Sequence, residues 1–363
     1  MNHKNAKPAP AIAAQNTSTS PARGTLAGPD ASGYYTAQIT GAAYVFPAGA
    51  KLRTVALQGY FTQVAGTWDA NGDGALTADD TETNARHTIS VSRSMANETR
   101  RQVIDSAKCA NCHEWFEGHG GNRVYDVQVC VTCHVPGITT SGRGMSDANL
   151  SAFYPNFTTD QQAILTSWTG VDFSTNPVTA GQTNVALKFP QVTNNMKDMI
   201  HGIHAGKTRT TNAFKIVRDR TPTAVNVINA AEIGYPGRLT NCQGCHTYNG
   251  YSGIPAGALA SRDEAVHDSN STAVSGSGVL TVFANNTTAD AKAALVTINT
   301  RDLVTTPFTA SCASCHDSAP AAAHMKLNGG QILVPRAVLN NAGESCAVCH
   351  GAGAAYDSAK VHK

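Results

Sequence analysis

Hydrophobic and polar positions alternate most clearly in the first hundred residues of the chain. Four segments combine β-branched or aromatic residues with polar ones and are separated by Gly and Pro: 33–40 (GYYTAQIT), 42–46 (AAYVF), 51–64 (KLRTVALQGYFTQV) and 87–95 (HTISVSRSM). Such alternation is typical of short strands bounded by turns. It predicts a small β-module over residues 31–100, sandwich-like in arrangement although short for an independent sandwich.

Two later segments have a helical pattern. Residues 98–108 are rich in helix-forming side chains. The segment 194–206 (NNMKDMIHGIHAG) predicts a helix that begins after Asn194 or Asn195 and ends at Gly206, because Asn caps a helix start and Gly a helix end.

The remaining segments show little periodicity. Residues 1–30 are rich in Ala, Pro, Ser, Thr and Asn and predict a flexible tail; the alternative is an arm that docks on a neighbouring subunit. Residues 136–190 are rich in Gly, Ser, Asn and Thr, and residues 262–300 predict a loop with one or two strands. We therefore expect a mostly irregular and α-helical domain over residues 101–363, preceded by the β-module.

An acidic segment inside the β-module has the spacing of a calcium loop. Residues 69–80 (DANGDGALTADD) carry oxygen donors at positions 1, 3, 5, 7, 9 and 12 of an EF-hand-like loop, with Gly74 at the sharp turn. The candidate calcium ligands are Asp69, Asn71, Asp73, the Ala75 carbonyl, Thr77 and Asp80. Asp at position 12 resembles the dockerin variety of this loop. The alternative is an Asp/Asn/Gly turn between strands, since clear flanking helices are lacking.

Composition makes a conventional hydrophobic core difficult to build. Aromatic residues are only 6% of the 363 residues, and the mean hydropathy is slightly negative. The formal charge is +2, and no basic patch indicates nucleic acid as a partner. No apolar run reaches the 18 or more residues of a membrane-spanning helix.

The cysteines indicate a cofactor that can provide this apolar surface. All 10 cysteines fall in five Cys-x-x-Cys-His motifs: Cys109–Cys112–His113, Cys130–Cys133–His134, Cys242–Cys245–His246, Cys312–Cys315–His316 and Cys346–Cys349–His350. This motif attaches haem c: two thiols form thioethers with one porphyrin, and the histidine ligates its iron. Structural zinc is the alternative, but zinc does not require a histidine after each second cysteine. The chain is therefore expected to carry five covalent haems, which organise residues 101–363 and provide much of its apolar surface.

The other histidines match the haem count. Five of them lie close to haem motifs or on the predicted helix, and we expect these to be the sixth iron ligands: His119, His201, His204, His324 and His362. His201 and His204 are three residues apart, so on a helix they can serve two adjacent haems. Met325 is an alternative to His324. The remaining three (His3, His87 and His267) are expected to be ordinary surface residues.

Six-coordinate irons decide the class of function. A bis-histidine haem has no open position for a substrate, keeps a low potential and moves single electrons. The expected function is electron transfer rather than enzymatic catalysis. A multihaem reductase is the less favoured alternative, because it needs one open haem, which pentahaem nitrite reductases mark with lysine in place of a motif histidine.

Covalent haem attachment also indicates a compartment. Haem c is attached outside the cytoplasm, so the chain is expected to be extracytoplasmic. The N-terminus lacks the 7–15-residue apolar segment of a secretory signal. The export signal is therefore expected to lie outside this numbering.

Several segments resemble the OmcA/MtrC family of outer-membrane multihaem cytochromes. They are AKCANCHEWFEGHGGNR, VQVCVTCHVPG, KDMIHGIHAG, YPGRLTNCQGCH, TPFTASCASCHDSAPAAAHM and ESCAVCHGAGAAYDSAKVH, in the family's order and spacing over residues 101–363. The segment AGAKLRTVALQGYFTQ is similar to the end of the β-domain that precedes such a haem domain. Family members typically have two β-domain and pentahaem units with ten haems, whereas this sequence has one unit and no cysteine left for a lipid anchor.

The resemblance implies a location and partners. In that family the five distal histidines fall at the positions given above. The protein is expected at the cell surface, where it receives electrons from other multihaem cytochromes or a porin–cytochrome conduit and passes them to metal oxides, flavins or a partner cytochrome. A single unit also fits a protomer that self-associates into a cytochrome filament.

The haem count is directly testable. Thioether bonds survive denaturation, so denatured protein is expected to exceed the mass of its polypeptide by five haem groups in mass spectrometry. A native protein that retains zinc, with no covalent mass excess, would establish the zinc alternative instead.

Overall fold

The computed structural model describes the chain in segments. The described residues are 24–27, 30–39, 46, 48–58, 60–61, 69, 72–79, 86–87, 89–95, 98–119, 123–138, 154–160, 162–163, 166, 193–209, 214–221, 224–248, 250–251, 253–255, 257–264, 300 and 302–362. The chain forms two compact units. One consists of Met1–Cys133 with Gly244–Thr247, and the other of His134–Gln243 with Tyr248–Lys363.

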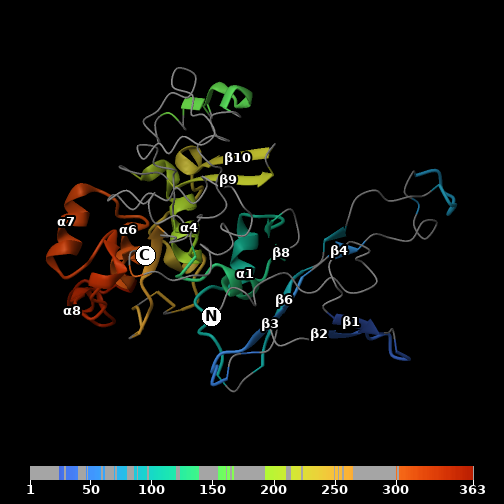
Figure 1. Cartoon of the computed structure of the whole chain (residues 1–363), viewed down its shortest axis with the longest axis horizontal. Helices are drawn as coiled ribbons and strands as arrows, with labels where there is room; N and C mark the ends of the chain where they lie inside the picture. The colour runs from blue at the N-terminus through green and yellow to red at the C-terminus, as the bar shows by residue number, and fades with distance from the viewer. Residues whose placement is uncertain are drawn as a thin grey trace. The chain divides into compact units, whose positions relative to one another are not determined.

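The N-terminal strands of the first unit form separate antiparallel pairs (Figure 1). The pairs are β1 (Gly24–Ala27) with β2 (Thr36–Ile39), β3 (Thr54–Leu57) with β6 (Val91–Ser94), and β4 (Tyr60–Phe61) with β5 (Arg86–His87). Strands therefore form inside three of the four predicted segments, and most of residues 42–46 lies outside the described residues. Two facing sheets are not present in the described part of this unit.

Strand β1 lies inside the segment 1–30, whose composition predicts a tail. Residues 1–23 of that segment lie outside the described residues.

The helix expected over residues 98–108 is wrong for most of its length. Only a 3₁₀ helix, η3 (Ser106–Asn111), forms there, and Asp105 caps it through its carboxylate, which accepts the Ala107 amide proton at 3.1 Å. The preceding residues are extended: Glu98 forms a β-bridge with Leu52, and Ile104 forms one with His246. Tertiary pairing with distant segments outweighs a weak local helix propensity here.

A short hairpin and a helix complete the first unit. The hairpin is β7 (Glu117–Gly118) with β8 (Arg123–Val124), and the helix is α1 (Val127–Cys133). Val124, Val127, Val129 and Val131 are buried. The Asp126 carboxylate accepts the Gln128 amide proton at 2.8 Å, so it stabilises the start of α1.

The second unit opens with η4 (Tyr154–Asn156) and contains the predicted helix, α4 (Met196–His204), which begins after Asn195. The short helix η5 (Gly206–Thr208) follows α4. A two-stranded sheet, β9 (Lys215–Thr221) and β10 (Ala224–Asn229), leads into η6 (Ala230–Glu232). The helix η7 (Cys242–Gly244) holds the start of the third haem motif.

The C-terminal part of the second unit is built around a three-stranded antiparallel sheet. Its strand order is β11 (Ser261–Glu264), β12 (Leu303–Thr305) and β13 (Val334–Pro335). The helices that follow or interrupt these strands are α6 (Pro307–Ala313), α7 (Ala319–Leu327), η10 (Arg336–Val338), α8 (Cys346–His350) and α9 (Ser358–Val361). Helix α6 packs against both α4 and α7 (Figure 1). No helix among the described residues is long and apolar enough to cross a membrane.

Among the described residues of the second unit, a small apolar cluster forms beside α4. Phe214 and Ala230 are buried, and Met199 and Ile203 of α4 pack against them. Gly206 is needed at this point, because a Cβ there would lie 1.8 Å from the Ala230 carbonyl oxygen. By contrast, large apolar side chains such as Leu327 (86% exposed) lie on the surface of the polypeptide. This agrees with the expectation that porphyrin rings supply apolar surface.

A buried ion-pair cluster holds the sheet to its surroundings. Asp302 and Arg262 are fully buried, and Arg262 Nη2 lies 2.9 Å from Asp302 Oδ1. Arg336 Nε lies 3.7 Å from Asp302 Oδ2. The Arg262 amide also donates to the Pro136 carbonyl at 2.8 Å, so the cluster ties β11 and η10 to the segment that follows the second haem motif.

Replacing Asp302 by Ala is expected to lower the free energy of unfolding by about 3–5 kcal/mol, because the carboxylate that both guanidinium groups share is removed from a buried place. Urea unfolding followed by circular dichroism measures the effect. Glu232→Ala, at an exposed position on η6, is the control and is expected to change the value by less than about 0.5 kcal/mol. An Asp302→Ala variant as stable as the control would contradict this role.

Candidate haem-binding site

Backbone hydrogen bonds and helix bounds show that the first, fourth and fifth Cys-x-x-Cys-His motifs fold as helical turns. In the first motif the His113 amide donates to the Cys109 carbonyl at 2.9 Å, and in the fourth the His316 amide donates to the Cys312 carbonyl at 2.8 Å. The fifth motif is the whole of α8. Residues three and four apart share one helix face. The two sulfurs and the histidine of a motif therefore project to the same side, as attachment to a single porphyrin requires.

The cysteines are accessible for attachment. Each of the ten is exposed or half-buried, and none forms a disulfide. Partial burial raises the pKa of the Cys130 thiol to about 11, and the nearby Asp126 carboxylate acts in the same direction. Before haem attachment this thiol is therefore protonated and weakly nucleophilic at neutral pH.

Backbone pairing joins the first and third motifs in the first unit. The Asp105 amide donates to the Cys245 carbonyl at 3.1 Å, and the Thr247 amide donates to the Val103 carbonyl at 3.0 Å. The Lys108 ammonium donates to the His246 carbonyl at 2.7 Å. Two motifs that are far apart in the sequence are thus neighbours.

The start of the second motif helix is tied to the first motif. The Val127 amide of α1 donates to the Ser106 hydroxyl of η3 at 3.0 Å. A cleft of about 470 Å³ lies here, lined by Ile89, Ser106, Ala107, Tyr125 and Asp126. Its volume is within the range of about 300–1,000 Å³ that is usual for cofactor pockets.

Helix α4 carries two of the predicted distal ligands, His201 and His204. The imidazole of His204 contacts the ring of Tyr235 edge-on, with centroids 5.7 Å apart. Surrounding protein atoms lower the pKa of His201 by desolvation, and the Asp198 carboxylate opposes this effect. Desolvation therefore favours the neutral imidazole, which is the form that binds iron.

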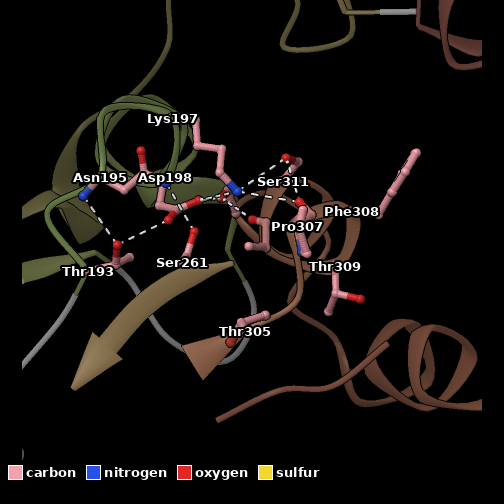
Figure 2. Close-up of polar contacts among 12 residues, drawn as sticks. Thr193, Asn195, Lys197, Asp198, Ser261, Thr305, Pro307, Phe308, Thr309 and Ser311 are labelled. Atoms are coloured by element: carbon pink, nitrogen blue, oxygen red, sulfur yellow. Dashed lines mark hydrogen bonds and ion pairs between the residues drawn. The ribbon is translucent and has the colours of Figure 1, made fainter. Parts of the chain in front are cut away.

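A polar network holds α4 against α6, the helix of the fourth motif (Figure 2). Asp198 is buried and accepts a hydrogen bond from the Thr193 hydroxyl at 3.1 Å. The Lys197 ammonium lies 3.5 Å from the Asp198 carboxylate and donates at 3.4 Å to both the Pro307 carbonyl and the Ser311 hydroxyl. Lys197 therefore connects α4 to α6.

Asn195 takes part in the same network. Asn195 is the N-cap residue of α4, as the sequence predicts. Its side chain, however, makes no cap hydrogen bond and donates to the Ser261 hydroxyl at 3.0 Å. The side chain therefore fixes α4 to strand β11 (Figure 2).

Backbone carbonyls orient four of the predicted iron ligands. Nδ1 of each ring lies within hydrogen-bond distance of a carbonyl oxygen: His134 with Asn194 at 2.8 Å, His204 with Ile200 at 2.9 Å, His350 with Tyr356 at 3.0 Å and His362 with Ser358 at 3.0 Å. A carbonyl can only accept, so the proton of each ring belongs on Nδ1 and the lone pair on Nε2. Metal-ligating histidines typically donate the N–H of their other ring nitrogen to such an acceptor.

Two pairs of predicted ligands have neighbouring rings, one pair tilted and the other edge-on. The ring centroids of His316 and His362 are 5.9 Å apart, and those of His324 and His350 are 6.2 Å apart. With a metal–imidazole bond of about 2 Å and about 1 Å from nitrogen to ring centre, two imidazoles on opposite sides of one iron have centres roughly 6 Å apart. Both pairs therefore fit a bis-histidine haem.

The two pairs are close to one another. Partial burial lowers the pKa of His316, and the nearby His362 and His350 imidazoles lower it further. His350 of the fifth motif thus lies near His316 of the fourth.

The other histidines are placed as follows. His119 lies in the turn between β7 and β8 with a left-handed backbone (φ 59°). His113 of the first motif contacts Phe116, with ring centroids 5.7 Å apart. Of the three histidines expected to be surface residues, His87 is in β5, and His3 and His267 lie outside the described residues.

The acidic loop of residues 69–80 folds around Asp69. Its carboxylate accepts amide protons from Gly72 at 2.7 Å, Asp73 at 3.2 Å and Gly74 at 2.9 Å. Asp73 accepts the Ala75 amide proton at 2.8 Å, and the Thr77 hydroxyl donates to Asp79. Two candidate ligands, Asn71 and Asp80, lie outside the described residues. No cluster of three or more metal-binding side chains occurs in the described part of the chain, and calcium stays a prediction.

Most of the chain matches a known protein family. The family of outer membrane cytochromes described as MtrC/MtrF-like, domains II/IV, matches residues 101–363. A comparison with curated proteins finds no match. The chain belongs to the MtrC/MtrF-like family, and the resemblance noted from its motifs is confirmed at that level. It is thus a multihaem cytochrome of the outer-membrane, electron-transferring class.

Asp198→Ala tests the network that holds α4. We expect it to lower the free energy of unfolding by about 1–3 kcal/mol, because Thr193, Ser314 and Lys197 lose a buried acceptor. Chemical denaturation measures it beside the Glu232→Ala control. Equal stability of the two variants would show that α4 is held by its apolar contacts instead.

Proposed function

We propose that this protein conducts electrons through five bis-histidine haems c outside the cytoplasm, as a relay in extracellular electron transfer. The most direct support comes from two histidine couples, His316 with His362 and His324 with His350. Their ring centroids are 5.9 and 6.2 Å apart. Each couple joins one motif histidine to one histidine outside the motifs. Both axial positions of those two irons would then be filled by protein.

The two centroid distances support one ligand assignment for each of two haems. The haem on Cys312 and Cys315 takes His316 and His362, and the haem on Cys346 and Cys349 takes His350 and His324. Met325, the sequence alternative to His324, is buried, whereas His324 faces His350. By count, His119, His201 and His204 serve the haems of His113, His134 and His246.

The bound haems supply reversible one-electron chemistry, and the chain's own residues determine how it is used. The backbone carbonyls of Ile200, Tyr356 and Ser358 hold the imidazole protons on Nδ1 and direct Nε2 away from the backbone. Two imidazoles on an iron exclude water and small ligands from it. Ligand exchange is therefore unnecessary during a redox cycle, which favours electron transfer over substrate turnover.

The domain arrangement follows from this role. We propose that residues 101–363 are the haem domain, that residues 31–100 are an accessory β-module, and that residues 1–30 are a tail whose strand β1 pairs with that module. Donors would be other multihaem cytochromes or a porin–cytochrome conduit. Acceptors would be metal oxides, flavins or a partner cytochrome at the cell surface, reached from an exposed haem without a dedicated substrate pocket.

Carbon monoxide binding tests the closed irons. Reduced wild-type protein is expected to bind no carbon monoxide, because every iron already has two imidazole ligands. His362→Ala is expected to create one binding site, at the haem of the fourth motif, and His324→Ala one site at that of the fifth. Optical difference spectra count the sites, and His267→Ala is the matched control with none. Binding to wild-type protein would overturn the proposal, and unchanged spectra for His362→Ala would overturn the pairing.

A further inference from the structure

Glu344 connects the last two haem motifs. It lies two residues before Cys346, the first cysteine of the fifth motif. Its carboxylate reaches the first turn of α6, the helix that carries Cys312 of the fourth motif. Four donors converge on it: the Thr306 hydroxyl at 2.7 Å, the Phe308 amide at 2.9 Å, and the Thr309 amide and hydroxyl at 2.8 and 2.7 Å.

This carboxylate replaces the usual helix cap. Thr306 is the N-cap residue of α6, but its side chain makes no cap hydrogen bond. Glu344 accepts the amide protons at the second and third helical positions instead, and the Thr306 hydroxyl donates to Glu344. Thr306 and Thr309 are 0% and 1% exposed, so water cannot take over these bonds. Loss of a buried hydrogen-bond partner is more costly than loss of an exposed one.

The segment around Glu344 is fixed on its other side as well. The Ser345 amide and hydroxyl both donate to the Asn328 carbonyl at the end of α7, at 3.0 and 3.2 Å. Gly329 approaches this segment so closely that a Cβ there would lie 1.8 Å from the Gly343 carbonyl oxygen. The residues that lead into α8 are therefore held between α6 and α7.

The charge of Glu344 lies near both attachment sites. Desolvation raises the pKa of the Cys312 thiol, and Cys346 and Glu344 raise it further. Desolvation also raises the pKa of the Cys346 thiol, again with Glu344 as a contributor. A negative charge close to a haem favours the oxidised, more positive iron and so lowers its reduction potential.

We propose that Glu344 is a positioning residue that fixes the fourth and fifth haems relative to each other and lowers the potential of both. The proposal rests on the function proposed above, since it requires haems at these two motifs. In this proposal the Glu344 side chain sets the distance between the fourth and fifth haems, and an electron crosses that distance. No apolar contact could replace it, because the α6 amides need an acceptor.

Two substitutions separate the geometric role from the charge. Glu344→Ala removes the acceptor, and the peptide that contains Phe308 and Thr309 is expected to exchange its amide hydrogens about tenfold faster. Glu344→Gln keeps one of the two carboxylate oxygens, which can still accept one of the Phe308 and Thr309 amide protons, whereas the NH2 group that replaces the other oxygen can only donate. Exchange is therefore expected to rise less than in Glu344→Ala, while the potentials of two haems rise. Hydrogen exchange by mass spectrometry and a potentiometric titration are the two measurements. The control is Glu98→Gln, an exposed carboxylate outside the haem motifs.

Electron paramagnetic resonance of the oxidised protein is the third measurement. Glu344→Ala is expected to change the magnetic coupling between two of the haems, whereas Glu98→Gln leaves it as in the wild type. Unchanged exchange, coupling and potentials in both Glu344 variants would overturn the inference. If Glu344→Ala does not accumulate, Thr309→Val removes one donor from the carboxylate and is expected to show the same changes in smaller measure; its failure to do so counts against the inference.

Peptide mass spectrometry of the wild type keeps the two proposals apart. Haem on both the Cys312 and Cys346 peptides leaves Glu344 as the only hypothesis under test. Absence of haem from either peptide would instead refute the proposed five-haem function, whatever the Glu344 variants show.

Discussion

An imidazole ligates iron only when its lone pair points at the metal, and the described structure is arranged to hold that orientation. His134, His204, His350 and His362 each have Nδ1 against a backbone carbonyl. Three of these carbonyls belong to helices or turns, and the fourth, that of Asn194, precedes α4. In the first, fourth and fifth motifs the helical turn then sets the sulfurs on the same side as the histidine. The positions of short helices such as α8 and α9 therefore matter more than the extent of any sheet.

Hydrogen bonds and ion pairs, rather than apolar contacts alone, hold several of the described helices and strands together. Asp198 and Lys197 join α4 to α6, Glu344 joins the approach of α8 to α6, and Asp302 joins Arg262 to Arg336. Each is a buried or half-buried charged group with several partners. Such groups hold a defined geometry because a misplaced charge in a protein interior is costly. A defined geometry is what a row of haems needs, since electron transfer depends on their separation.

Local sequence signals were reliable where the local chain decides the structure. The helix around His201 and His204 forms within the predicted segment, and strands form at 36–39, 54–57 and 91–94, inside segments of alternating pattern. The signal failed at 98–105, where a helix was expected. There the backbone pairs with Cys245 and Thr247, and nothing in residues 98–105 themselves indicates that distant partner.

The sequence by itself determined the chemistry of this protein. Ten cysteines in five identical motifs leave little choice of cofactor, and the motif order was enough to indicate the family that residues 101–363 match. Only the tertiary structure places the rings of His316 and His362 within 5.9 Å of each other, because the whole fifth motif separates these residues in the sequence. It also decided the acceptors of the imidazole protons, which are backbone carbonyls and carry no residue signature. The role of Glu344 depends on the same fact: its partners at 306–309 are identified by folding, not by spacing along the chain.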